Sequence, residues 1–225
     1  MAKIHGVAGE WARVKGTISG LKVLFAGFVV LGFSMAYLLF SGLLLGSILL
    51  IASIAFILWG LSRAQSRIER SFKGARGEER VAGILQSLPP DYHVFNDFIA
   101  CGVHVDHVIA GPVGVFAIET KCWRGAVTLE EGHILLDGQL PDRAPLKQAL
   151  QEAELVKTEL GKLGWTGSVT PVLTFASDNF EAAIAESQGA VIINSNHLRE
   201  SFVSGRTVLA PPELERLVRL METNS

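Results

Sequence analysis

Asp106, Glu119 and Lys121 are the residues whose types and spacing best suit chemistry. Two carboxylates and a lysine lie within a short stretch of otherwise apolar, mostly β-branched residues. Charges among such neighbours are costly to bury unless they are paired or bind a metal ion. Two carboxylates held together repel each other unless a cation, a proton or a lysine compensates. A solvated strand face with a weak ion pair is the simpler alternative, but the apolar surroundings favour a metal site.

The elements expected to position these residues are the two strands of a β-hairpin. Alternating β-branched residues flank residues 111–114 (Gly-Pro-Val-Gly), which predict a loop of about four residues. Pairing outward from this loop places Asp106 opposite Glu119, with Cβ atoms about 5 Å apart. The same register places Lys121 opposite His104. Strand alternation puts Glu119 and Lys121 on the face that carries Asp106, so the hairpin predicts one cluster of the three charged groups.

The N-terminal part of the chain contains a long uncharged run. From Val23 to Ser62 there is no Asp, Glu, Lys, Arg or His. One bilayer crossing takes about 20 predominantly apolar residues. The segment 22–62 therefore predicts two transmembrane helices, at about 22–40 and 43–61, with Ser41-Gly42 as the turn. A single helix of this length would extend about 60 Å, twice the hydrocarbon thickness, and is excluded.

Basic residues on both flanks orient this pair of helices. Residues 1–22 carry a net charge of +3, and residues 63–80 carry another +3. Basic flanks stay cytoplasmic. The N-terminal segment 1–21, the soluble domain and the C-terminus are therefore expected on the cytoplasmic side of a cell (inner or plasma) membrane. The basic juxtamembrane linker 63–73 and the basic flanks are expected to contact membrane lipids with anionic headgroups. No charge lies within the spans, so an anchor is favoured over a transporter.

The rest of the chain predicts an α/β domain at 74–205, followed by a C-terminal helix and tail at 206–225. Gly74 and Gly77 are expected to interrupt the helical pattern, and Asp142 to cap a later helix. The early strands pair by hairpins and the later ones follow a helix, which predicts a mixed sheet with flanking helices. Beside the hairpin, strands are expected at about 92–98, 125–129, 133–137, 169–176 and 190–194, and helices at about 77–87, 145–162, 196–203 and 211–222.

Four sequence elements together resemble a known family. Gly74-Ala-Arg-Gly77-Glu78 opens a helix, and Val105-Asp106-His107 lies in a strand. Gly114 to Lys121 ends in Glu-Thr-Lys, with Trp123 and Gly125 behind it, and Pro145 to Gln148 gives Pro-x-x-Gln on a helix. In this order they resemble the nuclease-related domain (NERD) family, which is placed in the PD-(D/E)XK nuclease-like superfamily. The resemblance implies a restriction-endonuclease-like fold over roughly residues 74–203.

The resemblance implies a metal-dependent phosphodiesterase site. Asp106 and Glu119 would ligate a divalent ion, Mg²⁺ or Mn²⁺, with the backbone carbonyl of Thr120 completing the set. Mg²⁺ suits such a site because it takes few carboxylates and keeps several waters. Lys121 would orient or activate the attacking water and neutralise charge that develops on the phosphate. The expected function is a membrane-anchored, nuclease-like protein that hydrolyses DNA.

Two further residues receive roles from the same resemblance. Glu78 would hold the metal or its water from the first helix, and Gln148 would position the site or the substrate from the long helix. Each residue also has an explanation without a role in the site. Glu78 can stabilise the N-terminus of a helix through its charge, and Gln148 can lie on the surface. His104 and His107 are left out of the metal shell, because histidines among apolar strand neighbours are more often core residues.

Charge argues against tight binding of nucleic acid. Residues 81–225 contain ten basic and 18 acidic residues, a net of −8, whereas affinity for a phosphate backbone comes mostly from Lys and Arg. The alternative function is a catalytically inactive, membrane-tethered module of the same fold that binds nucleic acid or protein. Cys101 and Cys122 have no CxxC spacing and predict neither a disulfide framework nor a zinc site.

Overall fold

The computed structural model describes residues 1–41, 43–177 and 179–223. The chain divides into two units, of which one is Trp11–Lys73 and the other combines Met1–Glu10 with Gly74–Ser225. Each unit is considered by itself. The unit that contains the sheet is called the sheet unit below, and Trp11–Lys73 is called the helical hairpin.

The helical hairpin consists of α1 (Glu10–Ser41) and the first part of α2 (Leu43–Gln86). Two helices are therefore present as predicted, although Gly42 of the expected turn lies outside the described residues. Small residues let them approach closely. A Cβ on Gly20 would lie 2.8 Å from Ile68 Cδ1, and one on Gly27 would lie 2.9 Å from Ile57 Cγ1. The helices thus pack along their length through glycine positions, as membrane helices do.

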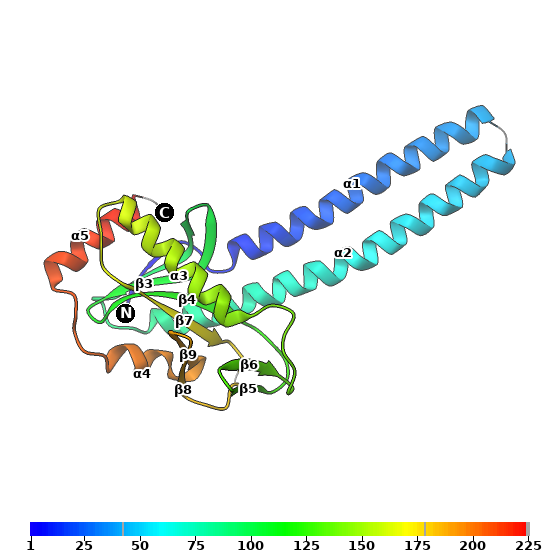
Figure 1. Cartoon of the computed structure of the whole chain (residues 1–225). Helices are drawn as coiled ribbons and strands as arrows, with labels where there is room; N and C mark the ends of the chain where they lie inside the picture. The colour runs from blue at the N-terminus through cyan, green and yellow to red at the C-terminus, as the bar shows by residue number, and fades with distance from the viewer. Residues whose placement is uncertain (42, 178, 224–225) are drawn as a thin grey trace. The chain divides into compact units, whose positions relative to one another are not determined.

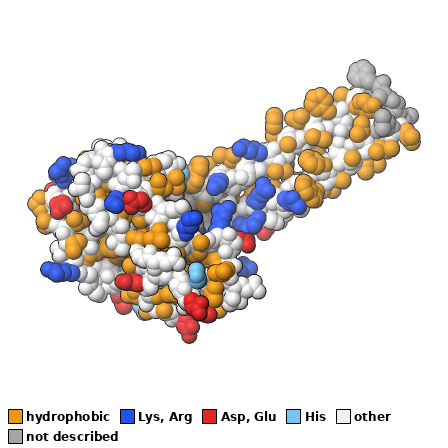
Figure 2. Space-filling view, viewed as in Figure 1, with side chains coloured by type: hydrophobic (Ala, Val, Ile, Leu, Met, Phe, Trp, Pro, Cys, Tyr) orange, Lys and Arg blue, Asp and Glu red, His pale blue; other side chains and the backbone are white. Residues whose placement is uncertain are grey.

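Both helices are long and apolar enough to cross a membrane. Large apolar side chains point outward along them, with Phe25 73%, Phe28 70% and Phe33 75% exposed. Such a contiguous apolar surface is far larger than soluble proteins usually expose. Figure 2 shows apolar side chains over much of the hairpin and Lys and Arg gathered towards one end of it. There the Arg63 guanidinium lies 4.1 Å above the Trp59 ring.

The predicted interruption at Gly74 and Gly77 is wrong, because α2 runs without a break to Gln86. Within the sheet unit, a Cβ on Gly77 would lie 2.7 Å from the Cβ of Cys122 and 3.3 Å from that of Ala176. Gly77 therefore serves close packing of α2 against the strand ends. A glycine inside a helix costs only about 1 kcal/mol relative to alanine, which this contact can offset.

The sheet unit is built on a mixed seven-stranded sheet, as predicted (Figure 1). Strands β2, β3 and β4 are antiparallel neighbours, β4, β7 and β9 are parallel, and a short strand lies at each edge. In spatial order the strands are β1 (Lys3–His5), β2 (His93–Ala100), β3 (Val103–Gly111), β4 (Gly114–Lys121), β7 (Val169–Phe175), β9 (Ala190–Asn194) and β8 (Ile184–Ser187). A separate hairpin joins β5 (Val127–Glu130) and β6 (His133–Leu136).

Helices cover both faces of this sheet. One apolar cluster joins α3 (Pro145–Lys162) and α5 (Pro211–Glu222) to the sheet, and another joins the end of α2 and α4 (Leu198–Val203) to its opposite face. Alternation along β3 explains this division, since Val108 belongs to the first cluster and Ile109 to the second. The sheet is therefore buried on both sides, which accounts for its nearly continuous β-branched sequence.

Most predicted elements are present within two residues of their expected bounds. The long helix has the predicted bounds, but its N-cap is Ala144, so the expected cap at Asp142 is wrong. Pro145, in the first turn, starts the helix because its fixed φ is already helical. A 3-10 turn (Ser195–His197) precedes α4. The edge strands β1 and β8 were not predicted, because three or four residues carry too little alternation to be recognised.

Candidate active site

The hairpin of β3 and β4 forms with the predicted register, but its backbone ladder ends sooner than expected. The pairs run from the loop to His107↔Ile118 and do not continue to Asp106 and Glu119. Instead, the Thr120 backbone N–H donates to Asp106 Oδ2 at 2.8 Å. A side-chain carboxylate thus takes the place of a carbonyl from the neighbouring strand, and the hairpin opens at the position where the charged residues begin.

The strand on the other side of Asp106 is distorted at the same level. The β2–β3 pairs on either side of Asp97 place this residue opposite Asp106. Asp97 has φ 51°, in the left-handed region that non-glycine residues rarely adopt. Local strain of this kind costs on the order of 1–3 kcal/mol and clusters at functional sites. The sheet is therefore irregular on both sides of Asp106.

Four side chains of the site form one hydrogen-bonded network. Lys121 Nζ forms a short ion pair with Glu119 Oε1 and also donates to Gln148 Oε1 at 2.8 Å. Gln148 Nε2 in turn donates to Glu152 Oε1 at 2.8 Å. The glutamine amide can bridge a cation and an acid because it presents one acceptor and two donors. Lys121 is fixed from two elements, β4 and α3.

Glu78 of α2 completes the cluster from the opposite side. Its side chain is buried, and desolvation raises its pKa to about 7, with further increases from Asp97 and Glu119. A hydrogen bond from the Gly9 backbone and the charge of Lys121 partly oppose this shift. Gly9, at φ 73°, lies so close to α2 that a Cβ would meet Ala75 at 2.9 Å. The backbone turn at Gly9 therefore packs against α2 next to Glu78.

Two further carboxyls of this cluster, Asp106 and Glu152, also have a raised pKa. Burial is the largest cause that raises the pKa of Asp106 well above its usual range, and repulsion from Glu119 and Glu78 raises it further. Asp106 is nevertheless partly accessible to solvent. Burial and Glu119 raise the pKa of Glu152 to about 9. A hydrogen bond between Glu152 and Glu119 requires a proton on one of them. Without that proton, Glu152 Oε2 is buried with no donor among the described residues.

This cluster contains many more acidic side chains than basic ones. It holds four carboxyls (Glu78, Asp106, Glu119 and Glu152), while Lys121 is the one basic side chain for which a contact within it is described. Carboxylate oxygens that repel one another bind hard divalent cations well. The donor set therefore fits Mg²⁺ or Mn²⁺. It contains no sulfur, and its nearest histidine in sequence, His107, is a core residue.

His107 is fully buried and its Nδ1 lies 2.8 Å from Asn96 Oδ1. Burial lowers its pKa to about 3, so the imidazole stays neutral and has a structural role. Trp123 packs against Phe175, with ring centroids 5.6 Å apart, and so contributes to packing.

All the predicted site residues lie together, but Glu152 was missed. The structure brings Asp106, Glu119, Thr120 and Lys121 together on β3 and β4, with Glu78 and Gln148 from two helices. Glu152 lies one helical turn after Gln148, a spacing that puts both on one face of α3. An acidic residue one turn behind a candidate site glutamine is therefore the sequence signal that could have identified it.

An open cavity of about 540 Å³ adjoins this cluster. Gln148 and Glu152 form its inner side, and Val103 of β3 and exposed residues of α3 form the rest. Another cavity of similar volume lies by α4 and is lined by none of the site residues. Of the four carboxyls, Glu152 is the one that lines the cavity beside Gln148.

Comparison with known proteins agrees with this geometry. Residues 73–176 match the family model of the nuclease-related domain, a segment that contains every site residue named above except Gly9. No curated protein and no solved structure matches the chain. The segment 73–176 of this chain is a nuclease-related domain (NERD), a member of the PD-(D/E)XK-like nuclease superfamily.

Proposed function

We propose that this chain is a membrane-anchored, cytoplasmic nuclease that hydrolyses DNA phosphodiester bonds with Mg²⁺ or Mn²⁺. The observation that carries the proposal is the cluster of four carboxyls around a single fixed lysine. Burial and mutual repulsion raise the pKa of three of them, so the metal-free arrangement is costly. Perturbed acids of this kind, next to a cavity, are typical of catalytic centres.

The residues that would hold the ion are Asp106, Glu119 and the backbone carbonyl of Thr120, with Glu78 from α2 on the far side. Domains of this nuclease-like family generally depend on divalent metals. When bound, the ion would polarise a phosphoryl oxygen and acidify a water molecule. The Thr120 N–H keeps Asp106 oriented at the strand end, so this ligand is positioned without relying on the ion.

Lys121 and Gln148 would act on the substrate. The ammonium group is held by Glu119 and Gln148, and the Lys121 side chain is only 16% exposed, so it presents a fixed positive charge within the carboxyl cluster. There it would orient water and offset the charge that develops on the phosphate. Gln148 would keep Lys121 in place, and Glu152 would keep Gln148 in place through its 2.8 Å hydrogen bond.

The acidic surface is the observation that favours the alternative function. A net charge of −8 over residues 81–225 provides little attraction for a polyanion. A catalytically inactive module that binds nucleic acid or protein would tolerate this charge, but it would not need the costly carboxyl cluster. We therefore favour the nuclease over the inactive binding module, and a cleavage assay distinguishes these two functions.

Cleavage by the purified full-length chain in detergent micelles tests the function. Linear, circular and single-stranded DNA and RNA are incubated with Mg²⁺, Mn²⁺ or chelator. Asp106→Asn and Lys121→Met should each lose at least about 99% of metal-dependent cleavage, since removing one such group commonly costs 10²-fold or more. Glu215→Gln, an exposed change on α5 away from both cavities, is the matched control. No cleavage of any substrate by folded wild-type protein would favour the binding module.

The anchor is the second part of the proposal. The hairpin exposes a continuous apolar surface, and its basic residues and the Arg63–Trp59 contact lie where the apolar part of α2 ends. Trp and Arg at that level are typical of a membrane–water interface. With basic flanks on both sides, both termini and the sheet unit would face the cytoplasm and anionic lipids. A reporter fused after Ser225 tests the topology, and activity as a periplasmic fusion would contradict it.

A further inference from the structure

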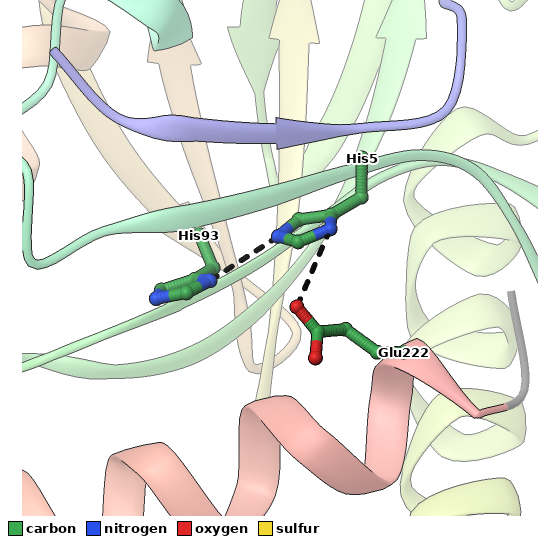
Figure 3. A group of neighbouring side chains, drawn as sticks. All are labelled: His5, His93 and Glu222. Carbon is green, nitrogen blue, oxygen red and sulfur yellow. Dashed lines mark hydrogen bonds and ion pairs between the residues drawn. The ribbon is translucent and has the colours of Figure 1, made fainter.

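A second group of potential metal ligands lies at the β1 edge of the sheet, away from the carboxyl cluster. His5 is in β1, His93 begins β2, and Glu222 ends α5 (Figure 3). His5 Nε2 lies 3.2 Å from His93 Nδ1, and His5 Nδ1 lies 3.8 Å from Glu222 Oε1. One ligand atom from each residue can be chosen so that all three lie within 4.8 Å of one another.

The fold fixes the two imidazoles. Parallel pairing of β1 with β2 places His5 beside Phe95, and the rings of these two residues stack with centroids 4.3 Å apart and planes 10° apart. The His93 ring is nearly parallel to that of His5, at 11°. Because Phe95 is buried in the core, the position of the His5 ring is set by the sheet itself.

Glu222 is brought to the same place by an independent element. Met221, the residue before it, is fully buried in the cluster that also contains Phe95, so the end of α5 is held against this edge of the sheet. The carboxylate itself is 46% exposed. It can therefore move towards the imidazoles at little cost.

The distances match a tetrahedral ion. With metal–nitrogen bonds of about 2.0–2.1 Å, neighbouring ligand atoms of a zinc site lie about 3.3 Å apart. His5 Nε2 and His93 Nδ1 already have this separation, at 3.2 Å. The 3.8 Å contact of Glu222 is with the other nitrogen of His5, Nδ1, so the carboxylate has to move towards Nε2 to share the ion. Two imidazoles and one carboxylate are ligands that suit zinc and related ions rather than Mg²⁺.

We propose that His5, His93 and Glu222 bind a Zn²⁺-class ion in a three-ligand site whose fourth position is open to water. Such an ion would link the N-terminal strand and the end of the C-terminal helix to β2. None of these residues belongs to the carboxyl cluster, so this site stands whether or not the chain is a nuclease.

An ion bound at this site would also restrict the motion of the turn that follows β1. Asn96 Nδ2 donates to Gly6 O at 3.4 Å, and the Gly9 backbone donates to Glu78. Both contacts involve the few residues directly after His5. Fixing His5 would therefore limit the motion of a segment that reaches the carboxyl cluster.

Zn²⁺ and Co²⁺ titrations of the full-length chain test the proposal. The protein is purified in detergent without a histidine tag, stripped with chelator and titrated by calorimetry with excess Mg²⁺ present to occupy the carboxyl cluster. We expect one Zn²⁺ per chain, and visible absorption typical of tetrahedral Co²⁺. His93→Gln and the exposed Glu222→Gln should each weaken Zn²⁺ binding at least about tenfold, since even residues behind a ligand contribute that much.

Three variants serve as controls. His197→Gln removes an imidazole whose Nδ1 lies 3.7 Å from Glu200 on an exposed helix turn, an otherwise similar pair without a third ligand. Cys101→Ser removes an exposed thiol, and Asp106→Asn alters the carboxyl cluster. All three should bind Zn²⁺ as the wild type does. Absence of Zn²⁺ binding, binding lost in any control, or binding unchanged in both His93→Gln and Glu222→Gln would overturn the proposal.

Discussion

Replacing Glu78 by glutamine should stabilise the metal-free protein at pH 8. In the folded chain, burial next to Asp97 and Glu119 raises the pKa of Glu78 from 4.5 to about 7. Its ionisation therefore opposes folding at higher pH. One pKa unit corresponds to about 1.4 kcal/mol, so above pH 7 the ionised side chain costs about 3 kcal/mol relative to its protonated form. Glutamine keeps the shape and the acceptor oxygen but cannot ionise.

The direction of the pH dependence follows from proton binding. Glu78 binds its proton more tightly in the folded chain, so its stabilising contribution is fully present below about pH 4.5 and is lost as the pH rises through 7. The gain from Glu78→Gln should thus be below about 1 kcal/mol at pH 5 and reach about 3 kcal/mol by pH 8. For a protein of this size, that gain raises the melting temperature by about 6–12 °C.

Thermal unfolding of the full chain in the presence of chelator measures this effect. Tryptophan fluorescence can report it because Trp165 is buried in the core of the sheet unit. Glu154→Gln, on the exposed side of α3, should change the melting temperature by less than about 2 °C. Saturating Mg²⁺ should stabilise the wild type and stabilise Glu78→Gln less. A metal-free Glu78→Gln protein that is no more stable than the wild type at pH 8, or equally stabilised at pH 5, would refute the reasoning.

Three other changes test neighbouring contacts by urea unfolding. Gly111→Ala should destabilise the hairpin by about 1–3 kcal/mol, because its Cβ would lie 2.4 Å from the buried Tyr92 ring; an unchanged midpoint would contradict that packing. Lys121→Met should lower the free energy of unfolding by about 3 kcal/mol or more at pH 8 without metal, since it leaves buried carboxylates without a positive partner. If the loss were smaller at pH 8 than at pH 5, Lys121 would not be compensating these carboxylates. Gln148→Leu should cost about 1–3 kcal/mol, because Lys121 and Glu152 both lose a partner; a neutral effect would argue against the bridge.

The sequence could predict the hairpin and its charged residues for a physical reason. Alternation of side chains is strict in a sheet, so a single loop at residues 111–114 fixes which positions share a face. The register up to His107↔Ile118 is the predicted one. The charged residues beyond it also come together, even though the ladder stops there and Asp106 bonds the Thr120 backbone instead.

The departures from the prediction are local responses to packing and charge. Asp97 adopts φ 51° inside a strand, and no sequence pattern identifies an aspartate that will do so. Gly77 continues a helix because Cys122 and Ala176 come from distant parts of the chain to pack on it. Such contacts exist only after the sheet and α2 have met, so local propensity could not reveal them.

Glu152 is the clearest case in which the site overrides the pattern of an element. It lies among the buried positions of α3, between Ala149 and Val156, where an apolar residue would pack at no electrostatic cost. A carboxyl there is tolerated because Gln148 donates to it, but Gln148 is itself held by Lys121. Glu152 is thus bound to the cluster rather than to the core. An acid on the buried stripe of a helix, one turn from a polar residue, is better interpreted as part of a site than as an error in the periodicity.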